Sequence, residues 1–262
     1  MTPEILAALD ALAAQVRDWA IAGGLVFARI GPVFALVPAF GERVVPVRIR
    51  LVTALAMTAV VGPAVTPVLP APPATVLDLA QYLGAETLVG VILGLSLRLM
   101  TLALVMAGIK AAQATSLAQA FGGAGVDPQP AVAQLLLMAG LAAAVATGLP
   151  QRMAAWLVLS YDLFAPGTWP APDVLAAWGT ARAAQAFALA FSLAAPFVIG
   201  AGLYNLALGA INRAMPQLMV AFVGAPALTL GGLVLLMLAA PLMLSLWLPA
   251  FHAVLGDPGS LP

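Results

Sequence analysis

Few side chains in this sequence are suited to covalent chemistry. Its one histidine, His252, lies near the C-terminal end, without an HExxH motif or a second imidazole to complete a metal site. Acidic residues are almost absent from the apolar stretches, Glu86 being the main exception, so a catalytic pair of carboxylates is lacking. Neither Ser96 nor Ser192 has a base near it in the sequence. The sequence therefore predicts neither an enzyme nor a metal or other cofactor.

Composition indicates a membrane protein. Of the 262 residues, 63% are hydrophobic and only 8% are charged, with a mean hydropathy of +1.08, whereas roughly 25% of the residues in a soluble domain are charged. Stretches without any charged residue cover 51–77, 128–151, 183–212 and 214–256. Each is long enough for the roughly 20 residues that a helix needs to cross a bilayer. Because these stretches are apolar on all sides, they favour helices over the alternating strands of a barrel. We expect an all-α, polytopic helical membrane protein that forms a single domain over residues 1–262.

Net charge and cysteine usage exclude further classes. Ten basic residues balance ten acidic ones, so nothing predicts binding to nucleic acid or broad binding to anionic lipid. The sequence has no cysteine, so it can form neither a disulfide nor a thiolate metal site.

The N-terminal segment carries acidic residues where a cleavable signal would carry positive charge, so we expect it to belong to the mature chain. Its apolar residues recur at helical spacing, which predicts a short amphipathic helix at a membrane interface. These apolar residues are Ile5, Leu6, Leu9, Leu12 and Val16.

Six apolar blocks follow, at about 19–41, 47–69, 79–109, 131–160, 180–208 and 217–251. The turn ERVVPVRIR at 42–50 contains three arginines, whereas the Pro-rich turns at 62–73 and 165–172 contain no lysine or arginine. The positive-inside rule therefore predicts a cytoplasmic 42–50 turn and an outside N-terminus. The charge-free run 214–256 would be roughly 65 Å long as one helix, so its prolines and glycines are expected to kink or turn it. The sequence therefore fixes the number of membrane crossings only to within one.

Arginines inside apolar stretches are costly and are usually paired or functional. Arg29, Arg98 and Arg213 are such residues, and each either snorkels to an interface or pairs with an acid; Arg98 follows Glu86 by twelve residues. A second pattern is GxxxG at Gly90 and Gly94, which allows helix backbones to approach closely within one subunit or between subunits.

The pattern R-x-x-P occurs three times in the sequence. Proline removes an amide donor and interrupts a helix, and an arginine one turn away can donate to the carbonyls left over. Such broken backbone persists in lipid only where protein or water covers it. These positions are therefore expected to be joints between helices or subunits. The predicted joint residues are Arg29, Pro32, Arg43, Pro46, Arg213, Pro216 and Gln217.

The segment from Lys110 to Gln134 is more polar than its neighbours, and FGGAGVDPQP holds three glycines and two prolines in ten residues. That composition does not sustain a helix. Two interpretations remain open from the residues alone. One is a flexible surface loop, and the other is a re-entrant loop that lines or closes an aqueous passage.

Taken together, these stretches resemble the FliR/SctT family, whose members are subunits of the type III export gate. The resemblance is carried by ARIGPVFALVPAFGERVVPVRIRLVTALA (28–56), VDPQPAVAQ (126–134), LSYDLFAPG (159–167) and, most specifically, NRAMPQLMVAFVGAP (212–226). The whole chain takes part, since length, number of blocks and order of motifs agree with the family. The PQLMVAFVGAP part looks nearer to the flagellar than to the injectisome branch.

The resemblance implies a core subunit of the flagellar export gate in the bacterial inner membrane, within the flagellar basal body. Members of the family assemble with FliP and FliQ subunits, associate with FlhB and FlhA, contact membrane lipid, and pass unfolded flagellar proteins as substrates. The runners-up are the injectisome counterpart and a secondary transporter for a small solute, which would need discontinuous helices around a midplane site.

The resemblance also implies a pore plug between the third and fourth blocks, with Phe121 as a bulky stopper and glycines as hinges. The residues that this assigns to the plug are Gln119, Phe121, Gly122, Gly123, Gly125, Asp127, Pro128 and Pro130. One departure from the family pattern concerns the most specific motif, which commonly has Asn after PQL and Phe two residues later. Met219 and Ala221 stand there in this chain, which puts a polar role at position 219 in doubt. Family members fused to FlhB imply a cytoplasmic C-terminus, which conflicts with six simple crossings.

Overall fold

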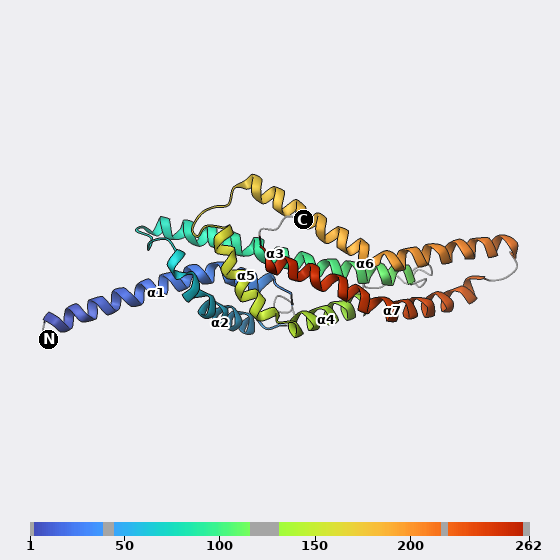
Figure 1. The fold of residues 1–262 in the computed structure, drawn as a ribbon, viewed down its shortest axis with the longest axis horizontal. Helices are drawn as coiled ribbons and strands as arrows, with labels where there is room; N and C mark the ends of the chain where they lie inside the picture. The colour runs from blue at the N-terminus through green and yellow to red at the C-terminus, as the bar shows by residue number, and fades with distance from the viewer. Residues whose placement is uncertain (1–2, 39–44, 116–130, 216–219, 259–262) are drawn as a thin grey trace. The chain divides into compact units, whose positions relative to one another are not determined.

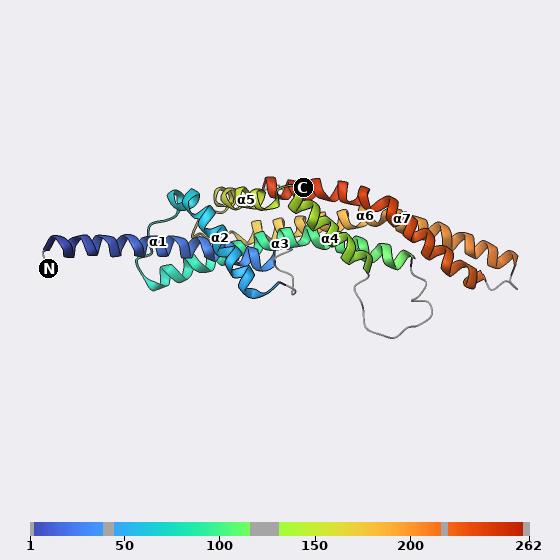
Figure 2. The ribbon, with the colours of Figure 1, turned by 90° about the horizontal axis from the view of Figure 1, so that it is seen from below.

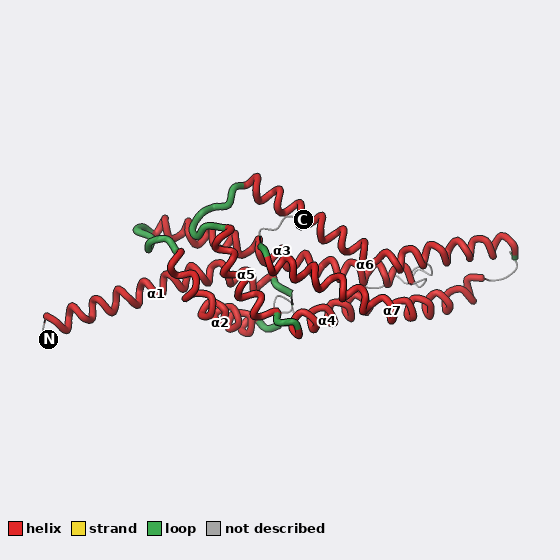
Figure 3. Tube along the Cα trace, in the orientation of Figure 1, coloured by secondary structure: helices red, strands yellow, loops and turns green. Residues whose placement is uncertain are grey.

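The computed structural model describes residues 3–38, 45–115, 131–215 and 220–258 of the chain. Within these residues it consists of helices and the turns that connect them, and no strand occurs (Figure 3). The helices are α1 (Pro3–Leu36), α2 (Val47–Val65), the 3-10 turn η1 (Thr66–Val68), α3 (Val76–Thr115), α4 (Ala131–Ala146), α5 (Leu149–Leu163), α6 (Pro172–Ala214) and α7 (Val220–Gly256).

The expected fold class is confirmed. Each of the six apolar blocks is largely helical over its described residues, because backbone groups without water must satisfy their hydrogen bonds inside the segment. Among the described residues, five helices are long and apolar enough to cross a membrane, or six if the bent pair α4–α5 forms one span.

By their internal contacts the residues form two compact units, which are described separately. Unit 1 comprises residues 1–98, 148–180 and 254–261, and unit 2 comprises 99–147, 181–253 and 262. The long helices α3 and α6 each contribute one part to unit 1 and the other part to unit 2. The single domain expected from the sequence stays a prediction.

Unit 1 is built on α1, α2, α5 and the first part of α3. Helix α2 packs against α1 and α5 (Figures 1 and 2). The two glycines of the GxxxG pattern face α1: a Cβ at Gly90 would overlap the Arg29 carbonyl oxygen, and one at Gly94 would lie 2.9 Å from the Leu36 Cβ. Backbones of α1 and α3 therefore meet closely here, so the glycine pair packs within this chain.

Unit 2 is organised around Trp247 of α7, which is completely buried. Its indole Nε1 donates a hydrogen bond to the Met100 carbonyl of α3 at 2.8 Å, and its ring stacks on Phe251 at 4.8 Å between centroids. Gly140 of α4 makes room for this ring, since a Cβ there would come within 3.3 Å of the indole. Trp247 thus joins α7, α3 and α4.

Three details differ from the sequence expectations. The amphipathic N-terminal helix is continuous with the first apolar block, so α1 begins at Pro3 rather than near residue 19. The block 131–160 divides at Gly148, which has a φ of 87° and separates α4 from α5. The last block contains no turn within α7, which runs as one helix through Pro226, the two adjacent glycines and Pro241, the places that the sequence offered for a kink or a turn.

Candidate functional site

The most polar cluster in the core of unit 1 is centred on Arg29. This residue lies on the buried face of α1 and has no solvent exposure, and Glu86 on α3 is 2% exposed. Arg29 Nε donates to Glu86 Oε2 at 2.6 Å, and Nη2 donates to Oε1 at 3.1 Å. Arginine and glutamate thus form a side-on bidentate ion pair, the geometry that the planar guanidinium fork favours.

The remaining guanidinium donors point to the end of α5. Arg29 Nη1 donates to the carbonyl oxygen and the hydroxyl of Ser160, at 3.0 and 3.2 Å, and Nη2 also donates to the Phe164 carbonyl at 3.0 Å. All five N–H groups of the guanidinium are therefore used. A cation at this place also interacts favourably with the negative end of the α5 dipole.

The aromatic ring of Tyr161 closes one face of the cluster. The Arg29 Cζ lies 3.6 Å from the ring centroid, which is a cation–π contact. The Tyr161 hydroxyl is buried and has no hydrogen-bond partner among the described residues. The ring, rather than the phenol oxygen, is thus the part of Tyr161 that contributes to the site.

The loop after α5 completes the cluster. The Gly167 amide donates to Glu86 Oε1 at 2.8 Å. Gly167 has a φ of 74°, and a Cβ there would lie 3.0 Å from the Tyr82 ring, so both the backbone conformation and the space require glycine. We call the set Arg29, Glu86, Ser160, Tyr161, Phe164 and Gly167 the arginine junction. It joins α1, α3, α5 and the following loop. The guanidinium of Arg29 and the carboxylate of Glu86 make their hydrogen bonds with other members of the junction, which suits a structural role rather than binding or catalysis.

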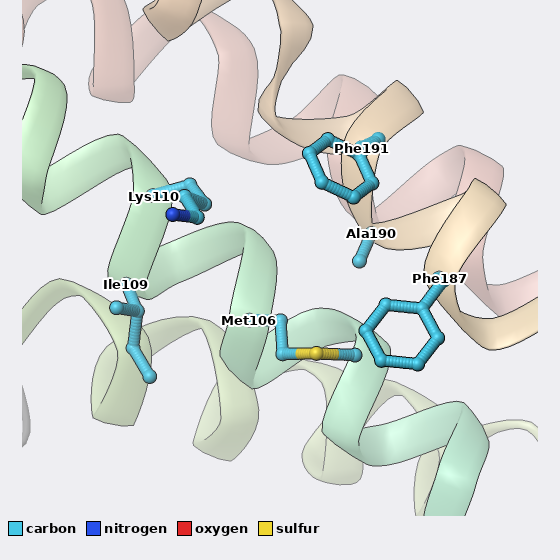
Figure 4. A pocket seen from close by; sticks show the side chains of 6 residues that line it. All are labelled: Met106, Ile109, Lys110, Phe187, Ala190 and Phe191. Carbon is cyan, nitrogen blue, oxygen red and sulfur yellow. The ribbon is translucent and has the colours of Figure 1, made fainter. Parts of the chain in front are cut away.

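An apolar hollow lies in unit 2 (Figure 4). It has a volume of about 120 Å³ and lies between α3 and α6, where Phe187 and Phe191 stand opposite Met106 and Lys110. The Lys110 amine is the single ionisable group in its lining. The hollow offers no pair of polar groups for chemistry. In the part of the chain that is described, no cluster of three or more His, Asp or Glu side chains could hold a metal ion.

The predicted joint residues have different surroundings. Arg29 lies at the arginine junction, but its donors go to α3 and α5, and α1 continues through Pro32. Arg29 thus donates to groups on other helices, and the role of the R-x-x-P residues as joints stays a prediction. Pro46 precedes α2 as its N-cap, and Arg213 is exposed in the last turn of α6. Arg43, Pro216, Gln217 and the whole plug segment from Gln119 to Pro130 lie outside the described residues.

Sequence reasoning marked Arg29 and Glu86 separately but did not pair them. Arg98, for which an acid partner or an interface was expected, donates to the Leu36 carbonyl at 3.5 Å. The other members of the arginine junction all come from LSYDLFAPG (159–167), a stretch noted only for its resemblance. A usable signal was present, because a lone acid and a lone arginine in apolar blocks are expected to pair.

Comparison with known proteins identifies the family. Residues 20–254 match the family described as "Bacterial export proteins, family 1". The chain belongs to this family. The "Flagellar biosynthetic protein FliR" of Caulobacter vibrioides is 35% identical over 234 residues, which cover 88% of this chain and 93% of that protein. The resemblance to the FliR/SctT family is thus confirmed, and the arginine junction lies wholly inside the part shared with the export proteins.

Proposed function

We propose that the chain is a core subunit of the flagellar type III protein-export gate in the bacterial inner membrane. It assembles there with FliP-like and FliQ-like subunits, and unfolded flagellar proteins pass through the channel that they form. The observation that carries this proposal is the 35% identity over 88% of the chain to a flagellar biosynthetic FliR protein.

The uncovered surface of the helices supports an assembled state. In an apolar stretch of 18 residues within each of α2, α6 and α7, only 17%, 28% and 17% of the residues are buried. Large apolar side chains such as Phe191 of α6 and Leu238 of α7 are more than 60% exposed. Lipid covers such faces in a lone membrane protein, but helices as long as α6, at roughly 65 Å, exceed the hydrocarbon thickness about twofold. Partner subunits can cover the excess length.

The arginine junction has a supporting part in this proposal. It holds α1, α3 and α5 of unit 1 together through the hydrogen bonds of Arg29 and Glu86. A gate subunit needs fixed surfaces for its neighbours, so the junction acts on assembly and not on the passage of substrate. The predicted joints at Arg43, Pro46, Arg213, Pro216 and Gln217 are proposed to contact neighbouring subunits.

The segment from Gln119 to Pro130, between α3 and α4, is proposed as the plug of the closed channel. This rests on the resemblance and on its glycine- and proline-rich composition. Deletion of 120–128 is expected to raise ion leakage and sensitivity to small toxic solutes while export continues, measured in cells that assemble the complete gate. Unchanged leakage in a correctly assembled complex would count against the plug.

Two measurements test the function itself. Loss of the gene should abolish secretion of flagellar hook and filament proteins, and expression of the intact chain should restore it. Affinity-tagged chain should copurify from detergent-solubilised membranes in a stable complex with FliP-like and FliQ-like proteins. If loss of the gene abolished secretion of injectisome effectors instead of flagellar proteins, the chain would belong to the injectisome branch. If the chain functioned as a lone monomer or dimer, a role in the gate would be excluded.

A further inference from the structure

One apolar stripe runs along the whole length of α1. Its members follow each other at alternating intervals of four and three residues, which is the heptad spacing of a helix that packs along another helix. The stripe comprises Ile5, Leu9, Leu12, Val16, Trp19, Gly23, Val26, Ile30, Val33 and Val37, the last just after the helix end.

The two halves of this stripe differ in burial. Val26, Ile30 and Val33 are at most 1% exposed, and α3 approaches Val33 closely at Gly94. In contrast, the first five members, from Ile5 to Trp19, are 50 to 72% exposed. We call these five residues the N-terminal seam. The seam is therefore the uncovered continuation of a stripe that this chain already uses to pack one helix on another.

Charge confines the seam to one side of the helix. Asp10, Arg17 and Asp18 lie on the opposite side in the heptad, and Arg17 pairs with Asp18. Segment 5–18 thus carries most of its large apolar side chains along the seam. Hydrocarbon all round it would bury three charged groups that have no partner on another element among the described residues. A shallow hollow lined by Leu12, Gln15, Val16 and Trp19 offers a place for an apolar side chain from outside.

The continuity of α1 argues against a position flat on the lipid surface. An interfacial helix joined to a membrane span needs a bend between them, and α1 has no break from Pro3 to Leu36. In both views its N-terminal half runs clear of the other elements of unit 1 (Figures 1 and 2). With the nearly charge-free part from residue 19 onward in the bilayer, residues 5–16 project by roughly 18 Å at about 1.5 Å per residue.

We propose that the N-terminal seam docks an apolar helix of a neighbouring gate subunit, with Leu, Ile or Val at heptad spacing over two heptads. This inference rests on the proposed function. The seam lies directly before the part of the chain that the family match covers, which begins at residue 20. A protein helix fits better than lipid, because the seam is narrow, straight and backed by charges.

Site-specific photocrosslinking in the complete export complex tests the proposal. Benzoylphenylalanine replaces Leu12 in the seam or, as the matched control, Ala14 on the opposite side of the same helix. We expect an adduct from position 12 with a FliP-like or FliQ-like subunit, identified by mass spectrometry, and little from position 14. An adduct only with a second copy of the chain, an adduct only with lipid, or no adduct would overturn the proposal.

A double variant adds a functional readout. Leu9→Glu with Leu12→Glu should lower recovery of the complex by at least about tenfold, while the level of the chain in the membrane stays unchanged because both side chains are exposed. Ala7→Glu with Ala14→Glu, on the charged side, should leave recovery unchanged. If the partners copurify but position 12 gives no adduct and the double variant does not lower recovery, the seam is not a docking site and the proposed function stands. If no partner copurifies with the unmodified chain, both fail.

Discussion

Arg29 and Glu86 stand 57 positions apart in the sequence and form a bidentate ion pair in which neither residue is more than 2% exposed. A buried pair gains little net stability, because desolvation of two charges offsets their attraction. Its consequence lies in what happens when one partner is lost. The surviving charge is then buried without water or a counter-charge, which is costly. The pair therefore favours the one arrangement of the helices in which both groups meet.

The first prediction concerns single and double removal of this pair. Arg29→Leu and Glu86→Leu should each lower the free energy of unfolding by about 3–5 kcal/mol. The double variant should recover part of that loss, because no uncompensated charge remains. Denaturation of the purified chain in mixed detergent micelles measures the differences. Arg17→Leu is the control, since the Arg17 side chain is 71% exposed and should tolerate the change. A double variant less stable than both single variants would contradict the interpretation.

The second prediction separates the ring of Tyr161 from its hydroxyl. Tyr161→Phe keeps the ring over the guanidinium and removes a buried hydroxyl that has no partner among the described residues, so stability should be unchanged or slightly higher. Tyr161→Leu removes the cation–π contact and should cost about 2 kcal/mol. The same denaturation measurement distinguishes them. A large loss in Tyr161→Phe would contradict this interpretation, because it would show that the hydroxyl forms a stabilising hydrogen bond in the folded chain.

The third prediction tests the close approach of α1 and α3. A methyl group at Gly90 would overlap the Arg29 carbonyl oxygen, so Gly90→Ala should separate the helices and cost about 1–3 kcal/mol. Gly24→Ala on α1 is the matched control, because a Cβ there meets no atom within 4 Å. Alanine favours the helix over glycine by about 1 kcal/mol, so the control should be neutral or stabilising. Equal losses in both variants would show that backbone approach is not the cause.

The positions of the helices could be predicted from the sequence because apolar runs in a membrane have few alternatives to the helix. The arginine junction could not, because the partner of Arg29 depends on the register between α1 and α3, which neither helix encodes alone. Glu86 lies on the same helix as Arg98 yet faces Arg29. Gly90, one turn after Glu86, could have indicated this register, since it marks where a second backbone comes close to α3.

The divided fourth block shows a different limit. The run from 131 to 160 is mostly apolar, with Arg152 as its one charged residue, so its overall composition did not mark a break. The signal was local: Gly148 adopts a left-handed conformation and Pro150 stands in the first turn of the next helix. The continuous α7 is the converse case. Its prolines and paired glycines are tolerated inside one helix, although they offered places to turn it.

The fourth prediction concerns Arg213, an arginine between two long charge-free runs. Its side chain is exposed in the last turn of α6, where a cation contributes only about 0.3–1 kcal/mol through the helix dipole. Arg213→Ala should therefore leave the stability of the isolated chain nearly unchanged but reduce copurification of FliP-like and FliQ-like subunits. Arg213→Lys keeps the charge but lacks the planar guanidinium, so this variant should assemble normally only if charge alone is required. Normal assembly with lost secretion of flagellar proteins would instead assign Arg213 to the path of the substrate.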